Sequence, residues 1–549
     1  MKILKAITPL SVLVLLLASC SSPFDKLDSK QVFRYNESSN ITSLDPAFAR
    51  SQSNIWAVNQ IFNGLLQLNE RLEIEPCIAK SWELSDDGKI YTFYLRTDVY
   101  FHDSPCFTGS KGRKVIASDV VYSFNRIIEP KLASPGAWIF RNIKTGNDGL
   151  PTIHRKNDSV LVIELEKPFP PFPGLLTMQY CSVLPHEAIS YFAEDFRRNP
   201  VGTGPFYFAM WKEGVKLVLL KNNNYFESEN GAALPYLDAV AISFIADKHT
   251  AFLEFIKGKL DFMSGIDAGY KDELLTQSGE LNPKYAGKIK KITNPYLNTE
   301  YLAFQINPDL SQNQNNVLLI PEIRKAINYG FDRTRMIRFL RNNIGQPGIY
   351  GMVPPGLPSF DSNLVKGYDY DPDKVFELLE KSGFPGGKDL PDITIATNST
   401  YLDLTRYIQH QLNELGFKIK IDVSPPATLR ELMAYGRSPF FRASWIADYP
   451  DAENYLSLFY SKNFTPVGPN YTHFRSDNFD RLYNLAMHET NDSIRFVYYR
   501  KMDQLVMDQA PVVVLYYDQV LRFIHNNVEN LDNNAMNLLV LKRVKKNNT

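Results

Sequence analysis

The chain has 549 residues, of which 44% are hydrophobic and 22% are charged, as expected for a folded protein of roughly two to four domains. The 60 Lys and Arg residues balance the 60 Asp and Glu residues, which argues against a nucleic-acid-binding protein because such proteins carry clustered basic residues. Aromatic residues make up 13% of the chain, a content that suits both a large core and a cleft for a flexible ligand.

The N-terminus has the pattern of a secretory signal. Lys2 and Lys5 precede an apolar run that is too short for a stable membrane span, and small residues follow it before Cys20. The stretch "LASC" resembles a bacterial lipobox, in which lipid is attached to the Cys. We therefore expect a lipoprotein signal peptide over residues 1–19, lipidation at Cys20, and a polar tether over residues 20–30. An ordinary cleaved signal with an incidental Cys is the alternative.

Three further cysteines follow, namely Cys77, Cys106 and Cys181. An odd number leaves at least one thiol unpaired, and no C-x-x-C motif indicates a redox or zinc site. We expect all three to be small buried hydrophobic residues.

The first half of the chain predicts mainly strands. Alternating apolar and polar residues indicate a strand over 31–35 and a hairpin that begins near Trp82. An amphipathic helix is expected over about 53–63. A helix over 118–128 is expected, with Ser118 as its N-cap. Further strands are expected within 159–165, 199–211, 216–226 and 237–245.

The second half alternates helices and strands. Residues 321–333 form an expected helix with Ile320, Ile323, Ile327 and Phe331 on one face, and a second helix begins at the cap Asp371 and stops at Gly383. Strands within 392–398, 417–424 and 440–447 then alternate with helices over 401–416 and 428–436, which predicts a βαβαβ unit with parallel strands.

The segment "DYPDAEN" (448–454) follows the last of these strands directly. Ligands of such sheets bind beyond the carboxyl ends of the strands, so this segment is expected to face a cleft.

No familiar catalytic or cofactor motif is present. The sequence lacks a P-loop, G-x-G-x-x-G and G-x-S-x-G, and its eight His residues are scattered without metal-ligand spacing. The acids Asp448, Asp451 and Glu453 lack the EF-hand pattern. We expect no metal, no cofactor and no enzymatic activity, although two nearby carboxylates leave a hydrolase as an alternative.

An ordered series of segments resembles one protein family. The segments "SLDPAF", "QIFNGLLQLN", "ASDVVYSFNRI", "NPVGTGPFYF", "IRKAINYGFDR", "WIADYPDAENYLSLFYS" and "APVVVLYY" are similar, in this order, to those of the extracytoplasmic peptide-binding proteins of ABC importers, solute-binding family 5. The resemblance implies an α/β, two-lobed periplasmic-binding-protein type II-like fold with an extra subdomain in the first lobe. Two crossing strands would join the lobes, which close over ligand about a hinge.

The resemblance also implies domain limits. Lobe I would comprise residues 31–65, 200–290 and 510–549, with the extra subdomain over 66–199. Lobe II would comprise residues 291–509.

Matching motifs imply the ligand-binding residues. Asp448 would pair with the α-ammonium of a peptide, with Trp445, Ile446 and Tyr449 as pocket wall. The stretch "PYLNTEY" would supply Tyr296 and Tyr301, Arg442 would meet a ligand carboxylate, and the loop with Arg50, Gln52 and Ser53 would give backbone contacts. The alternatives are packing roles for the two tyrosines, a local carboxylate partner for Arg442, and a loop-capping role for Asp448.

The resemblance implies a lipid-anchored receptor that captures peptides and delivers them to a membrane permease. The permease and ATPase would be separate chains, and we expect a monomer that binds no nucleic acid. A non-peptide solute, such as an oligosaccharide or a metal chelate, is the alternative ligand, because one fold hosts several functions.

Overall fold

The computed structural model describes residues 31–547, except for residues 148, 268, 311–312 and 314–315. The expected signal peptide, Cys20 and the tether lie outside this range. Among the described residues, no helix combines the length and the apolar character needed to cross a membrane.

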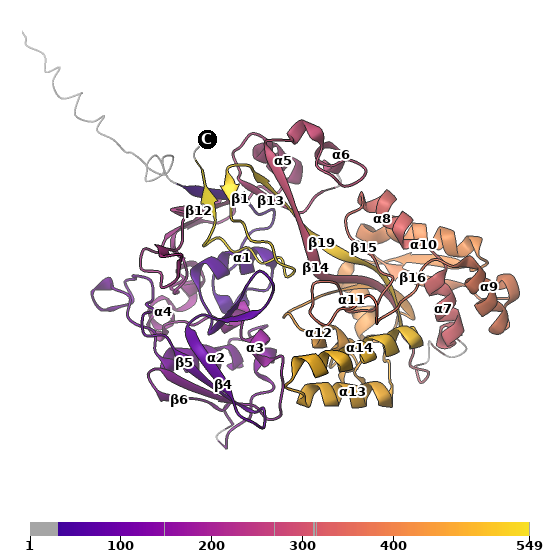
Figure 1. Cartoon of the computed structure of the whole chain (residues 1–549), viewed down its shortest axis with the longest axis horizontal. Coiled ribbons are helices and arrows are strands. Elements are labelled where there is room, and N and C mark those ends of the chain that lie inside the picture. Colours follow the sequence, from indigo (N-terminus) through magenta and orange to yellow (C-terminus); the bar gives the residue numbers. More distant parts are fainter. Residues whose placement is uncertain (1–30, 148, 268, 311–312, 314–315, 548–549) are drawn as a thin grey trace, which may run out of the picture.

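One mixed, eleven-stranded sheet runs through both halves of the molecule (Figure 1). Its strands, in spatial order, are β17 (Ile419–Val423), β16 (Ile393–Thr397), β18 (Phe440–Ile446), β14 (Ile289–Phe304), β19 (Val512–His525), β13 (Phe262–Ser264), β1 (Val32–Asn36), β12 (Ala239–Ser243), β9 (Lys216–Lys221) and β8 (Phe206–Lys212). The short β15 (Gln346–Pro347) pairs with β19.

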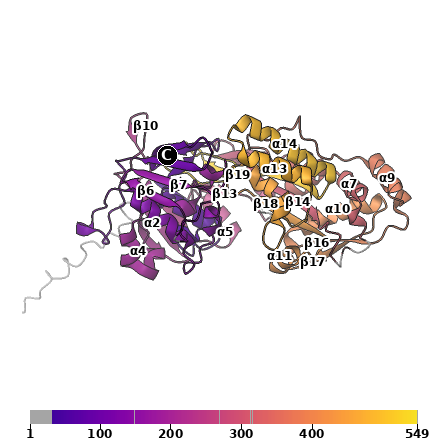
Figure 2. The same ribbon diagram turned by 90° about the horizontal axis from the view of Figure 1, so that it is seen from below.

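The two longest strands of the sheet, β14 and β19, pair antiparallel and belong to both halves. Toward one end β19 pairs with β13 of the N-terminal half, and toward the other β14 pairs with β18 of the C-terminal half. Seen from below, the two halves lie side by side (Figure 2). This is the two-lobed fold that the sequence predicts, whereas the exact residue limits of the lobes stay a prediction.

Lobe I is built on β1, which pairs parallel with β12 and β13. Its sheet packs against α1 (Gln52–Ile61) and α5 (Lys248–Ile256), and the short α6 (Lys271–Leu274) follows. The C-terminal segment is held on α1, because Trp56 Nε1 donates to the carbonyl of Asn537 at 2.8 Å and Gln60 Nε2 donates to that of Leu539 at 2.8 Å. Two separate antiparallel pairs of strands also occur in this lobe, namely β10 (Ser228–Glu229) with β11 (Ala232–Ala233), and β20 (Val528–Glu529) with β21 (Lys545–Lys546).

The extra subdomain contains an antiparallel four-stranded sheet of order β4-β5-β7-β6. Its elements are β4 (Ala79–Leu84), β5 (Ile90–Leu95), β6 (Ile153–Asn157), β7 (Val160–Glu164), α2 (Ala117–Ile128), α3 (Phe172–Leu175), α4 (His186–Phe192) and the hairpin β2 (Leu66–Leu68) with β3 (Ile74–Pro76). The hairpin predicted near Trp82 is confirmed as β4 and β5.

The predicted N-cap Ser118 is wrong. Helix α2 begins one residue earlier, and Ile116 occupies the N-cap position. The carboxylate of Asp119 accepts the backbone N–H of Ile116 at 2.9 Å and also pairs with Arg113 at 2.7 Å. An acid in the first turn thus caps the helix from inside it, and a hydroxyl at the cap is not needed.

Lobe II contains the predicted βαβαβ unit. Strand β16 pairs parallel with both β17 and β18. The unit uses α10 (Leu402–Glu414) and α11 (Pro426–Ala434), and the further helices are α7 (Pro321–Tyr329), α8 (Arg333–Arg341), α9 (Pro372–Lys381), α12 (Glu453–Leu456), α13 (Asp477–His488) and α14 (Asp492–Gln509).

The local signals of lobe II are also confirmed. Asp371 caps α9 through Lys374 N at 3.0 Å, and Gly383 takes a positive φ of 86° just after the helix. Ile323, Ile327 and Phe331 are buried, and Ile320 packs against the same core.

The extra subdomain touches lobe II. Leu72, at the tip of the β2–β3 hairpin, packs in a lobe II core, and the Trp138 and Tyr449 rings lie 6.3 Å apart. These contacts place the end of β18 against lobe I.

Candidate ligand-binding cleft

The loop after β18 is fixed by one side chain. Asn454 Oδ1 accepts a hydrogen bond from Trp445 Nε1 at 2.8 Å and one from the backbone N–H of Asp448 at 3.3 Å. The N–H of Ala447 donates to the carbonyl of Leu297 at 2.9 Å, which continues the pairing of β18 with β14. The Asp448 backbone is therefore held on a strand end and by a helix residue, as a precise binding group requires.

Asp448 is an exposed carboxylate with no ion-pair partner among the described residues. The protein around it nevertheless raises its pKa by desolvation, against a smaller opposing effect of Asn454. Asp448 is thus accessible to water and still closely surrounded by protein, which suits a ligand-binding group.

Groups of lobe I lie near Asp448. Burial raises the pKa of Tyr180, Asp448 raises it further, and Arg50 lowers it. These effects require the three groups to lie close together. Asp448 of lobe II thus faces a tyrosine of the extra subdomain and the predicted loop residue Arg50.

The other acids of the segment are engaged inside the protein. Asp451 pairs with Arg495 at 3.5 Å and accepts the N–H of Glu453 at 2.8 Å. Glu453 accepts the hydroxyls of Tyr449 and Tyr483, and burial raises its pKa to about 7. Of the three acids in the segment, Asp448 is the exposed one, and it forms no ion pair with the described residues.

Arg442 forms a buried ion pair with Glu300 on the neighbouring strand. Its guanidinium also lies 3.2 Å from the centroid of the Tyr401 ring, a cation–π contact. Burial raises the pKa of Glu300 although Arg442 opposes this. The local partner considered for Arg442 is therefore present, and its contact with a ligand carboxylate stays a prediction.

The two tyrosines of "PYLNTEY" have different surroundings. Tyr301 is 4% exposed, sits in the lobe II core and pairs with Ala443 across the sheet. Tyr296 is half-buried, and burial followed by Asp518 and Glu300 raises its pKa to about 12. Tyr301 is thus placed for packing, and Tyr296 lines a cavity.

This cavity has a volume of about 370 Å³ and lies between lobe I and the crossing strands. It contains the predicted residue Gln52 together with Tyr296 and Trp56. Sequence reasoning missed Asp518, which lines it from β19.

The remaining predicted residues are arranged around the same region. Ile446 is 49% exposed, Trp445 is half-buried, and Arg50 and Gln52 are exposed. Ser53 is buried, with its hydroxyl 3.0 Å from that of Ser51, the N-cap of α1. The ring of Tyr449 is buried against lobe I, where it packs near Trp138.

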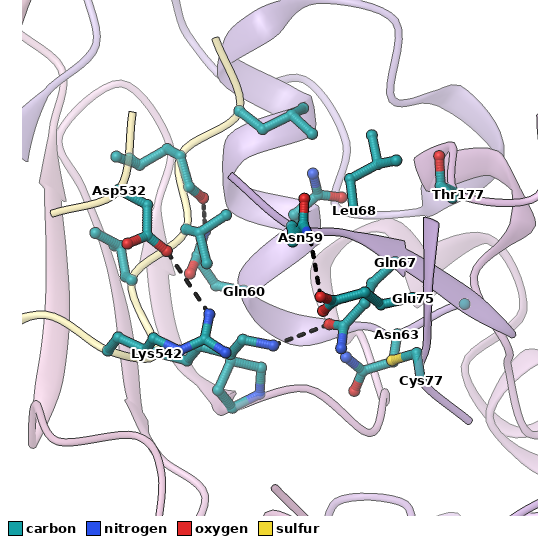
Figure 3. Close-up of a pocket in the computed structure, with 18 of the residues that line it drawn as sticks. Asn59, Gln60, Asn63, Gln67, Leu68, Glu75, Cys77, Thr177, Asp532 and Lys542 are labelled. Atoms are coloured by element: carbon teal, nitrogen blue, oxygen red, sulfur yellow. Dashed lines mark hydrogen bonds and ion pairs between the residues drawn. The ribbon is translucent and has the colours of Figure 1, made fainter. Parts of the chain in front are cut away.

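A smaller polar cavity of about 120 Å³ lies within lobe I, between α1, the β2–β3 hairpin and the C-terminal segment (Figure 3). Lys542 Nζ donates to Gln67 Oε1 at 2.9 Å and pairs with Glu227 at 2.5 Å. Asp532, which also lines this cavity, has its pKa raised to about 7 by burial and by the neighbouring Glu70.

Cys77 lines that cavity, and burial raises the pKa of its thiol to about 12. Cys77, Cys106 and Cys181 are all free; Cys77 and Cys181 are buried as predicted, whereas Cys106 is only half-buried. Within the described ranges, no cluster of His, Cys, Asp and Glu could hold a metal ion.

Comparison with known proteins defines the class. The family model described as "Bacterial extracellular solute-binding proteins, family 5 Middle" matches residues 73–466. The chain therefore belongs to family 5 of the solute-binding proteins of ABC importers, whose members are extracytoplasmic binding proteins.

Particular relatives cover nearly the whole chain. It is 26% identical to heme-binding protein A of Haemophilus influenzae, over 92% of this chain and 93% of that protein. It is 27% identical to the oligopeptide-binding protein OppA of Bacillus subtilis, over 93% of each. The solved structure of DppA from Helicobacter pylori in complex with the peptide STSA matches with a TM-score of 0.73 and 26% identity, over 95% of this chain and 99% of that one.

Proposed function

We propose that this protein is a lipid-anchored receptor that captures peptides in its interlobe cleft and delivers them to a membrane permease. The observation that carries the proposal is the carboxylate of Asp448, which is exposed near lobe I without an ion-pair partner among the described residues. Relatives named as peptide-binding proteins support the same ligand class.

The chemistry of a free peptide fits this carboxylate. An α-ammonium loses its hydration when two lobes close over it, and a buried cation needs a charged, hydrogen-bonded partner. Asp448 would supply that partner from a strand end, where burial raises its pKa and no cation of the described residues forms an ion pair with it. Binding of an ammonium there would lower the pKa again and stabilise both charges.

The anchor and delivery parts of the proposal rest on other features. Cys20 lies outside the described residues and is proposed as the lipid attachment site on the signal pattern alone. The permease and the ATPase are proposed as separate chains. The relatives are binding proteins of transporters and not enzymes, and a catalytic step is not proposed.

A non-peptide solute is the second candidate ligand, because one relative that covers nearly the whole chain is named a heme-binding protein. Gentle purification from the native host, followed by denaturation and mass spectrometry of what is released, separates the two candidates. Release of a mixture of short peptides supports the proposal. Release of a single non-peptide compound, together with no measurable affinity for peptides, rejects it.

A further inference from the structure

The cavity of about 370 Å³ beside the cleft contains an acidic residue that the proposed peptide clamp does not use. Glu37 follows β1 and lines this cavity together with Gln52, Trp56, Tyr270, Tyr296 and Asp518. Glu37 is half-buried, and its Oε1 is buried and accepts no hydrogen bond from the described residues. Burial raises its pKa to about 7, and no cation of the described residues forms an ion pair with this carboxylate.

The cations near the cavity have other partners. Lys248, which lines the cavity from α5, pairs with Asp267 at 3.0 Å. Arg341 pairs with Asp518 at 2.8 Å. Arg522 donates to the backbone carbonyls of residues 532 and 538. Among the described residues, Glu37 thus forms no ion pair with any of these three cations, of which Lys248 and Arg341 pair with other carboxylates and Arg522 bonds to backbone carbonyls.

The walls of the cavity are suited to a long side chain that ends in a positive charge. Tyr270 and Tyr296 contribute aromatic surface, whereas the buried rings of Trp56 and Phe262 already lie against the guanidinium of Arg522. Aromatic faces bind ammonium and guanidinium groups by cation–π attraction, and they also cover the methylene groups that precede the charge.

The cavity adjoins the Asp448 clamp through one residue. The N–H of Ala447 donates a hydrogen bond to the carbonyl of Leu297. Tyr296 precedes Leu297 on β14, and Asp448 follows Ala447 just after β18, so the antiparallel pairing sets the two residues opposite one another. Both groups also raise the pKa of the buried Tyr455 hydroxyl, which places them around one point. A ligand with its ammonium on Asp448 therefore has Tyr296 beside it and the cavity beyond.

We propose that this cavity is a subsite for a basic side chain on the first residue of the bound peptide, with Glu37 as its counter-ion. The inference rests on the proposed peptide function. Such a subsite would make the protein selective for peptides that begin with Lys or Arg over peptides that begin with an apolar residue of the same length.

Calorimetry with two matched tripeptides tests this. Lys-Ala-Ala and norleucine-Ala-Ala have the same chain length at the first residue and differ in its terminal ammonium. Wild-type protein is expected to bind the lysine peptide about tenfold more tightly, as one charge-assisted hydrogen bond in a partly desolvated site would give. In the Glu37→Gln variant, the affinity for the lysine peptide should fall about tenfold, while the affinity for the norleucine peptide should stay unchanged.

The norleucine peptide also reports on the fold of the variant, since its unchanged affinity requires an intact cleft. Glu414→Gln, which removes an exposed carboxylate on α10, is the charge-matched control and should change neither affinity. Equal affinities of the two peptides for wild type would overturn the subsite and leave the Asp448 clamp standing. Failure of both peptides to bind wild type would overturn the proposed function as well.

Discussion

Arg442 and Glu300 form a buried ion pair between the neighbouring strands β18 and β14, with the ring of Tyr401 against the guanidinium. Both side chains are less than a tenth exposed. Removal of one partner leaves an uncompensated charge in the protein, which costs about 3–5 kcal/mol in comparable pairs.

Arg442→Met is therefore expected to lower the free energy of unfolding by about 3–5 kcal/mol, as measured by urea denaturation. The double variant Arg442→Met with Glu300→Leu should recover most of this loss, because it removes both charges together. A single variant as stable as wild type would show that the pair does not form in solution.

Asp503 gives the stability of the protein a predictable pH dependence. Its carboxylate accepts the N–H of Met352 at 2.7 Å, and burial raises its pKa to about 7. A carboxyl whose pKa is raised on folding stabilises the fold below its unfolded pKa and loses that contribution as pH rises through the folded pKa. Between pH 5 and pH 8, wild type should therefore lose more stability than Asp503→Asn, by up to about 3 kcal/mol.

Chemical denaturation of both proteins at several pH values checks this difference. The amide of the Asp503→Asn variant would keep an acceptor for the Met352 N–H and cannot ionise. The two proteins share all other titrating groups, so the effects of those groups on stability cancel in the comparison. Parallel stability curves for the two proteins would contradict the raised pKa.

The local features of the chain could be predicted from sequence far better than the long-range ones. The cap at Asp371 and the parallel unit of β16, β17 and β18 follow from patterns within about fifteen residues, where apolar spacing and cap chemistry decide the outcome. The cap of α2 was misplaced because Asp119 also pairs with Arg113, which sequence spacing does not reveal.

The site shows the same division. The place of Asp448 just after a strand could be predicted from the sequence, and its role in a ligand cleft stays a prediction. Its neighbour Tyr180 comes from the extra subdomain, and Glu300 reaches Arg442 only through the register of β14 with β18. Such proximity depends on how distant segments pack, and a single sequence carries no local signal for it.

Ligand is expected to make the particle more compact. The lobes are joined by β14 and β19, and hinged closure about such strands brings the two walls of the cleft together. Small-angle scattering with a saturating peptide should give a smaller radius of gyration than scattering without it. An unchanged radius under conditions where calorimetry shows saturation would argue against hinged closure.

Cys20→Ala is expected to abolish the membrane anchor. Without the thiol, no lipid can be attached, and one apolar signal segment alone is too short for a stable span. The variant should be released or should retain its signal, as seen by mass spectrometry of the membrane and soluble fractions. A variant that partitions into detergent with the mass of the wild-type mature form would refute lipidation at this residue.

Asp448→Ala is expected to weaken the binding of a free peptide by about 30-fold or more. Loss of one partner of a buried, hydrogen-bonded charge pair costs at least about 2 kcal/mol, at about 1.4 kcal/mol per tenfold in affinity. An N-acetylated peptide should bind wild type poorly and should lose little further in the variant, because it carries no α-ammonium. Calorimetry with both peptides measures the four affinities.

Asp451→Asn is the matched control, since Asp451 lies in the same loop but pairs with the buried Arg495. It should lower the melting temperature and leave peptide affinity nearly unchanged. Asp448→Ala should weaken peptide binding and leave the melting temperature nearly unchanged, because Asp448 is exposed and has no ion-pair partner among the described residues. This opposite pattern separates a ligand clamp from a loop cap, because a cap would lower stability at Asp448 too. Wild type and Asp448→Ala with equal affinities for the free peptide would remove the clamp and the main reason to prefer peptides as ligands.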